Sequence, residues 1–348
     1  MKAVKLALQI AAVYIGTVVG AGFASGQEVY QFFGRFGGGG FVGIGIATCL
    51  FAWWGYRLLM LGAECQAASF QDLTAHALSP WLARGVNALV IAMLFGTTAA
   101  MLAGTGALFR EQLHLPYALG VLCAMAVAAV TTSFGIRGLF GANTAIVPVL
   151  CLFAAGLALV NLGNPAKRWA IFHPLAASGS LGAALLSALV YAAMNVGLSI
   201  GVLVPLGGRI RQPDALRNGA ILGALGLGAL LASVAVTLFA HAPDAYQYAV
   251  PMGRIAATYP RAVSVMFIAV LFGEIYSTLV GNLYGLLGER PTTRTKRFAA
   301  AGMVLCACAV FTAFGFRAIV QYGYTAFGWI ALWLLTVLTI ARGPLKTP

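Results

Sequence analysis

Long apolar runs separated by short polar loops make up most of this chain. Hydropathy divides it into ten such runs, and about 20 predominantly apolar residues suffice for a helix to cross a bilayer. The chain is 61% hydrophobic and only 8% charged, which is more apolar than a water-soluble core requires. The sequence therefore predicts an all-α polytopic membrane protein with ten transmembrane helices in a single domain, and it leaves no room for a folded extramembrane domain.

Hydropathy sets the bounds of these runs to within several residues. The runs cover residues 5–33, 40–63, 81–109, 117–134, 139–161, 179–206, 215–240, 261–288, 298–314 and 318–341. A short surface helix is expected in the connection 241–260. The basic start followed by an apolar run resembles a signal peptide, but a polar, glycine-rich interruption inside the first run argues against cleavage.

Lysine and arginine are distributed unevenly over the loops. With the N-terminus inside, 14 of the 21 basic residues fall on the cytoplasmic side and seven on the other. Cytoplasmic loops of membrane proteins carry such an excess, so we expect both termini in the cytoplasm. The net charge of +13 comes from these scattered loop residues, and no nucleic-acid partner is expected. The six cysteines show neither a metal-ligand spacing nor a disulfide framework.

The first run is interrupted at its middle by residues 16–28. Gly16, Gly20, Gly22 and Gly26 weaken a helix there, each by about 1 kcal/mol relative to alanine. A carboxylate at bilayer depth, here Glu28, costs about 2.5 kcal/mol or more. Both features favour a broken helix whose freed backbone groups line a polar cavity. The alternative is close helix packing, because Gly16 and Gly20 form a G-x-x-x-G pair.

The sixth run has a weaker signal of the same kind. Ser187, Tyr191, Asn195 and Ser199 are spaced four apart and share one helix face. Asn195 and Gly197 suggest a second break. The first and sixth runs each open a set of five, and five is odd, so the two halves cross the membrane in opposite senses. We therefore expect two inverted repeats, about 5–162 and about 178–342, with matching broken helices.

A resemblance to a known family supports this interpretation. The stretch from Gly16 to Phe23 resembles the helix 1 signature of amino acid/polyamine/organocation transporters, which share the LeuT fold. Together with residues 24–28 it is most similar to the bacterial YkvI-like membrane proteins. The resemblance implies a bacterial cytoplasmic (inner) membrane protein with a five-plus-five inverted repeat. It also implies that helices 1 and 6 are unwound at the substrate.

Two of the eight acidic residues, Glu28 and Glu274, lie within spans, where ionisable side chains are functional candidates. Glu274, Ser277 and Thr278 share one face of the eighth span. The resemblance implies that Ser277 and Thr278 bind sodium together with the carbonyls of Gly16 and Val19. Glu274 could bind the cation directly, or it could titrate and couple transport to protons. Alternatively, the two hydroxyls only bond to carbonyls of their own helix.

The role of Glu28 is open at this stage. A half-helix beginning near Ser25 would point backbone N–H groups at the cavity, and in the family that end receives a substrate carboxylate. Glu28 could compete for this place, bind a substrate amine, or cap the half-helix. The candidate substrate-binding residues are Gly20, Gly22, Ser25, Gln27, Glu28, Tyr191, Asn195 and Gly197. Tyr324 in the last span either lines the pathway or packs, and packing is favoured.

These features predict a secondary active transporter of a small polar organic solute, an amino acid or a related amine, coupled to Na⁺ or H⁺. The alternatives are a solute-sensing membrane receptor with a transporter fold, and a channel. An enzyme is not expected, because the chain has no H-E-x-x-H motif and its histidines lie near loops. No cofactor is expected apart from a possible bound Na⁺. The partners are the substrate and the bilayer, and the sequence leaves the oligomeric state open.

Overall fold

The computed structural model describes residues 2–133, 139–172, 179–210, 212–287 and 293–340, and these residues contain helices but no strand. Nine of the ten expected runs coincide with one principal helix each, or with a helix and its terminal turns. These helices are α4 (Gly38–Glu64), α6 (Pro80–Gln112), α7 (Tyr117–Ser133), α8 (Leu139–Gly163), α10 (Leu181–Arg209), α11 (Pro213–Phe239), α13 (Arg261–Leu287), α14 (Arg294–Phe311) and α16 (Thr325–Ile340). The all-helical prediction is confirmed for the described residues.

The first run forms three helices instead of one. These are α1 (Lys2–Val18), α2 (Ala21–Ala24) and α3 (Gln27–Phe32). Short elements fill the connections: η1 (Gly34–Phe36), α5 (Phe70–Ala77), α9 (Pro165–Phe172), η3 (Asp244–Gln247), α12 (Pro251–Ala256), η4 (Thr312–Phe314), α15 (Phe316–Ala318) and the π-helical turn η5 (Ile319–Tyr324). The elements η3 and α12 occupy the connection in which a surface helix was expected.

Seven helices within the described ranges are long and apolar enough to cross a membrane, or eight if the bent pair of α8 and α9 counts as one span. The bend between α8 and α9 is 107°. Two shorter apolar helices, within α1 and α7, fall below this length. The positions of the expected runs are thus confirmed as helices, whereas the count of ten spans stays a prediction.

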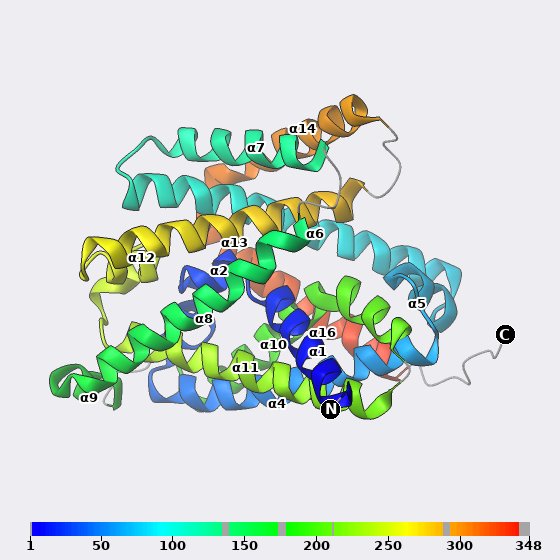
Figure 1. Cartoon of the computed structure of the whole chain (residues 1–348), viewed down its shortest axis with the longest axis horizontal. Coiled ribbons are helices and arrows are strands. Elements are labelled where there is room, and N and C mark those ends of the chain that lie inside the picture. The colour runs from blue at the N-terminus through cyan, green and yellow to red at the C-terminus, as the bar shows by residue number, and fades with distance from the viewer. Residues whose placement is uncertain (1, 134–138, 173–178, 211, 288–292, 341–348) are drawn as a thin grey trace.

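The helices pack in two groups (Figure 1). In the first group α4 lies along α10, and α1 lies along α11, which also packs on α4. In the second group α6 packs on α7 and α13, while α14 packs on α7 and α6. The helix α8 contacts α11 of the first group and α13 of the second. The break of the first span thus lies next to both groups, because α2 contacts α13 and α6 while α3 contacts α11 and α10.

Glycines permit the closest approach inside the first group. A Cβ on Gly62 of α4 would overlap the carbonyl of Val204 on α10, and a Cβ on Gly207 of α10 would overlap the carbonyl of Leu59 on α4. Small residues at helix crossings serve this purpose in membrane proteins, where dispersion and not water exclusion drives association. The backbones of α4 and α10 therefore meet directly, and α10 also contacts α1 and α3 of the broken first span.

The prediction of a break in the sixth run is wrong, because α10 continues without interruption from Leu181 to Arg209. The amide of Asn195 donates to the carbonyl of Tyr191 (3.0 Å), and the Ser199 hydroxyl donates to the carbonyl of Asn195 (2.7 Å). These polar groups are satisfied along their own helix. Gly197 instead permits close packing, since a Cβ there would lie 2.6 Å from the Cβ of Ala331 on α16.

Candidate functional site

The candidate site is built around the break in the first span. Gly20 has an extended backbone (φ −142°, ψ −174°), and Gly26 is left-handed (φ 80°), a conformation that favours glycine. Between them, the Ser25 hydroxyl donates to the carbonyl of Gly22 (2.8 Å) and accepts from the backbone N–H of Gln27 (3.2 Å). Ser25 is thus a structural residue of the break. Its hydroxyl bonds to a backbone carbonyl and a backbone N–H at the ends of the two short helices.

Gln27 and Glu28 begin α3 and are almost completely buried, at 0% and 5% exposure. Both polar atoms of the Gln27 side chain and the Oε2 atom of Glu28 lack a hydrogen-bond partner among the described residues. Buried polar groups are nearly always hydrogen-bonded, and a group left without a partner calls for an explanation such as a ligand or water. The sequence singled out these two residues, and the structure brings them together at the break.

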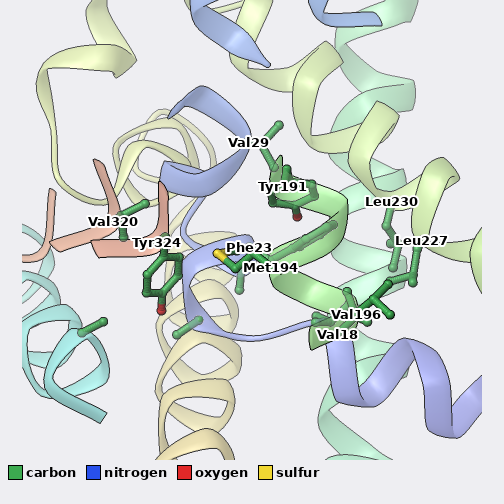
Figure 2. Packing of buried hydrophobic residues seen from close by; sticks show 14 of the residues in the cluster. Val18, Phe23, Val29, Tyr191, Met194, Val196, Leu227, Leu230, Val320 and Tyr324 are labelled. Carbon is green, nitrogen blue, oxygen red and sulfur yellow. The ribbon is translucent and has the colours of Figure 1, made fainter. Parts of the chain in front are cut away.

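Two tyrosines from other spans flank this pair. The hydroxyl of Tyr191 on α10 interacts with the Glu28 carboxyl, and Tyr324 from η5 lies within electrostatic range of it. Figure 2 shows the two tyrosines on either side of the break, with Phe23 and Met194 between them. Tyr191 is fully buried, and in the described part of the chain its hydroxyl meets no partner with hydrogen-bond geometry.

The aromatic neighbours of Tyr191 come from the far side of the break and from α4. The ring centroids of Phe32 and Phe33 lie 5.1 and 4.9 Å from that of Tyr191, and the centroid of Phe51 lies 6.1 Å away. These rings fix the orientation of Tyr191. The site therefore combines a carboxyl, an amide and a phenol hydroxyl with an aromatic wall.

Gly22 is needed because of Glu28. A Cβ on Gly22 would overlap the Glu28 carboxyl, so the acidic side chain folds back against the bare backbone of α2. The other predicted substrate residues lie differently. Gly20 faces Thr278 of α13, Asn195 bonds to its own helix, and Gly197 faces Ala331 of α16 and Met93 of α6.

The predicted ion site is brought together in part. A Cβ on Gly20 would lie 3.5 Å from the Thr278 hydroxyl, so α13 presents a hydroxyl to the break. The Ser277 hydroxyl donates to the carbonyl of Glu274 (3.0 Å), as the alternative of bonding within the helix predicted. Gly16, whose carbonyl was predicted to bind the ion together with that of Val19, faces Val147 of α8.

Glu274 is buried at 1% exposure, and its Oε1 atom has no hydrogen-bond partner within the described ranges. It lies near Cys151 of α8. No cluster of three or more His, Cys, Asp and Glu side chains that could hold a metal occurs in the described residues. The oxygen ligands that this face of α13 offers to a hard cation are the Thr278 hydroxyl and the Glu274 carboxyl.

The connection between α11 and α13 covers one side of the break. The backbone N–H of Met252 at the start of α12 donates to the carbonyl of Ser25 (2.9 Å). Glu111 at the end of α6 accepts from the N–H groups of Ala249 (2.9 Å) and Val250 (3.0 Å). Glu111 follows the third expected run (81–109), and no periodicity in the sequence signals that its carboxylate holds the chain entering α12.

Tyr324 was favoured as a packing residue, and it also lies at the site. The turn η5 is π-helical, so its hydrogen bonds span one residue more than those of an α-helix, and such turns are frequent at functional sites. Hydropathy does not report this change of register. The only sequence signal was the run of polar and aromatic residues from Gln321 to Thr325.

Two proteins of Bacillus subtilis (strain 168) are similar to this chain over nearly its whole length. The membrane protein YkvI is 31% identical over 345 residues, which cover 97% of this chain and 96% of YkvI. The protein YyaD is 26% identical over 330 residues, which cover 94% of each chain. No protein-family profile matches the chain.

Solved transporter structures share its fold at low identity. MhsT in complex with L-phenylalanine matches with a TM-score of 0.63 and 15% identity, over 96% of both chains. A manganese transporter of Eremococcus coleocola gives 0.60 and 15%, over 96% of this chain and 85% of the other. Inward-facing Mhp1 gives 0.55 and 15%, over 94% and 75%. The identity with YkvI over almost the entire length shows that this chain belongs to the YkvI family of membrane proteins, and its structural neighbours are LeuT-fold transporters.

Proposed function

We propose that the protein is a secondary active transporter that moves a small polar organic solute by ion-coupled alternating access. One observation carries this proposal: at a broken helix inside the packed bundle, buried polar atoms of Gln27, Glu28 and the neighbouring Tyr191 of α10 have no partners in the described residues. An interrupted span around such groups is typical of a solute site near the bilayer midplane. The proposed substrate contacts are Glu28, which packs on Gly22, together with Gln27, Tyr191 and the extended backbone at Gly20.

The proposed architecture has ten spans in two inverted repeats, about 5–162 and about 178–342. The packing supports it. The first and second spans of each repeat (α1, α4, α10 and α11) form one group, and the third and fourth of each (α6, α7, α13 and α14) form the other. The excess of basic residues favours termini on the cytoplasmic side of a bacterial inner membrane.

Coupling to Na⁺ or H⁺ is proposed at the face of α13 that meets the break. The Thr278 hydroxyl lies beside Gly20, and Glu274 lies one turn before it with an unpartnered oxygen. Hydroxyl and carbonyl oxygens suit Na⁺, and a buried carboxyl suits a proton. An amino acid or a related amine is the proposed solute, in line with the L-phenylalanine held by MhsT, which has the same fold.

Gradient-driven uptake into proteoliposomes tests the proposal. We expect saturable accumulation of an amino acid or amine that depends on an imposed Na⁺ or pH gradient, whereas liposomes without protein show none. Ser277→Ala combined with Thr278→Ala should lower the Na⁺ dependence if Na⁺ is the coupling ion. Binding without accumulation would support the solute-sensing receptor instead, and single-channel currents would support a channel.

A further inference from the structure

The electrostatic surroundings of Glu28 constrain what can bind beside it. The ion pairs among the described residues, Arg217–Asp214 and Arg254–Asp244, lie at the surface and do not include Glu28. Its carboxyl instead interacts with the hydroxyl of Tyr191 and lies within electrostatic range of Tyr324. A buried carboxylate is costly unless a cation pairs with it. Within the described ranges, the groups found beside Glu28 are hydrogen-bond donors and aromatic rings, and none of them carries a positive charge.

The carboxyl also takes up the space at the break itself. It lies against Gly22, where a Cβ would overlap it, and α2 and α3 meet around it. A ligand that places a carboxylate at this break would bring a second negative group next to Glu28. Two carboxyls in one buried site repel each other, and one of them must take up a proton. A ligand without a carboxylate avoids this cost.

An ammonium or guanidinium group fits the same surroundings. It would pair with Glu28 through a charge-assisted hydrogen bond. The packed rings of Tyr191, Phe32 and Phe33 suit a cation with an apolar body, because the faces of such rings attract positive charge. The unpartnered amide of Gln27 can bond to a further polar group of the ligand.

We infer that the site selects a small organic amine without a free carboxylate, which binds through its cationic group to Glu28 and is flanked by Tyr191 and Tyr324. This inference rests on the proposed transport function and names its substrate class. It distinguishes this chain from a carrier of zwitterionic amino acids, because here the protein itself provides the carboxylate at the break.

Three matched probes isolate the carboxylate as the deciding group. Phenethylamine, L-phenylalaninamide and L-phenylalanine share the amine and the ring, and only L-phenylalanine carries a carboxylate. Ligands that bind the folded state raise the unfolding temperature. We expect the two cations to stabilise the detergent-purified protein and L-phenylalanine not to. Agmatine and L-arginine repeat the comparison with a guanidinium. The inference is overturned if the amino acids stabilise the protein as much as the amines do. It is also overturned if none of the amines stabilises the protein.

Two variants test whether the amine binds at Glu28. Glu28→Gln should weaken amine binding, measured by calorimetry, by about tenfold or more, because it removes the charged partner of a hydrogen bond. Asp244→Asn, which alters an exposed ion pair, should leave the affinity unchanged. Unchanged affinity in Glu28→Gln also overturns the inference. The probe comparison in the natural protein stands even if Glu28→Gln fails to fold.

The failure of this inference can be told from the failure of the transport proposal. Gradient-driven uptake of L-phenylalanine, with no response to phenethylamine, would retain the transporter and reject the amine. Binding of phenethylamine that needs Glu28, without uptake under any gradient, would retain the amine site and reject transport.

Discussion

Gly22 and Glu28 act as a pair at the scale of single residues. The carboxyl folds back onto α2 only because position 22 carries no side chain. Glycine at this place is usually ascribed to helix breaking, but α2 is helical from Ala21 to Ala24 and contains Gly22. The space that Gly22 leaves free is filled by Glu28. This residue pair thus sets where the negative group of the site lies.

Gly22→Ala should therefore displace the Glu28 carboxyl. Forcing a methyl group into an occupied space costs about 1–3 kcal/mol, so we expect a lower unfolding temperature and at least about tenfold weaker solute binding. Gly45→Ala on α4, where a Cβ meets nothing within 4 Å, is the control and should behave as the natural protein. Natural binding affinity in Gly22→Ala would mean that Glu28 is not held in place by this contact.

The site residues differed in how far the sequence could predict them. Gln27 and Glu28 were predictable, since an amide and an acid within an apolar run are costly and need a reason. Tyr324 was not, because tyrosine in a span usually packs or anchors, and its approach to Glu28 depends on the π-helical turn 319–324. Hydropathy and spacing carry no information about such a change of helix register.

At the scale of elements, the two candidate breaks differ in whether the polar side chains of the span find partners on their own helix. In the first span, the acid and the amide have no partner on their own helix, and the chain breaks. In α10 the polar side chains of Asn195 and Ser199 bond to preceding carbonyls, and the helix continues. Polar residues close to glycines occur in both spans, and on α10 the glycine at 197 serves close packing against α16.

Gly197→Ala tests that distinction on α10. We expect a loss of stability of about 1–3 kcal/mol from overpacking against Ala331, seen as a lower unfolding temperature in detergent. Gly201→Ala, one turn later with nothing within 4 Å of a Cβ, should be neutral or slightly stabilising, since alanine favours helix. Full stability of Gly197→Ala with abolished uptake would instead identify Gly197 as a hinge.

A polar network joins four elements at the end of the bundle that carries α9 and α12. The Lys167 ammonium lies 2.8 Å from His241 Nε2 and 3.5 Å from the Tyr259 hydroxyl, which donates to Asn161 (3.2 Å). Because His241 Nδ1 bonds to the carbonyl of Thr237 (3.0 Å), Nε2 is left to accept from Lys167. This arrangement requires a neutral imidazole.

Burial holds the pKa of His241 below its usual value of 6.5, and Lys167 adds to this, against the opposing effects of the Thr237 carbonyl and Asp244. Below about pH 6.5 the unfolded chain binds a proton at this histidine that the folded protein does not. Stability should therefore fall as the pH drops from about 6.5 toward the folded-state pKa, and this histidine should contribute no pH dependence above that range.

The measurement is the unfolding temperature of the natural protein and of His241→Gln between pH 8 and pH 5. We expect the variant to be less stable at pH 8 and the difference to shrink as the pH falls. His76→Gln, at an exposed position, should keep the pH dependence of the natural protein. A difference that is constant across this range would show that His241 does not titrate within the network.

At the scale of the whole molecule, the two helix groups meet at the break of the first span and at α8. The first group carries Glu28 and Tyr191, and the second carries Thr278 and Glu274. Relative movement of the groups would thus separate or join the solute contacts and the proposed ion site. Such rocking about a fixed site is the basis of alternating access. In the proposed inverted repeats, the two halves also cross the membrane in opposite senses.

Cysteine labelling tests this topology directly. In a variant with the six natural cysteines replaced, single cysteines at Gln212, before α11, and at Asp244, after it, lie at exposed positions. With cytoplasmic termini, an odd number of spans precedes Asp244 and an even number precedes Gln212. A membrane-impermeant maleimide added to intact cells should therefore label the cysteine at 244 and leave that at 212 unlabelled until the membrane is permeabilised.

Labelling of both from outside would show that α11 does not span the membrane. Labelling of 212 alone would keep α11 as a span but show the opposite orientation. Most basic residues would then lie on the outer side, against the usual bias.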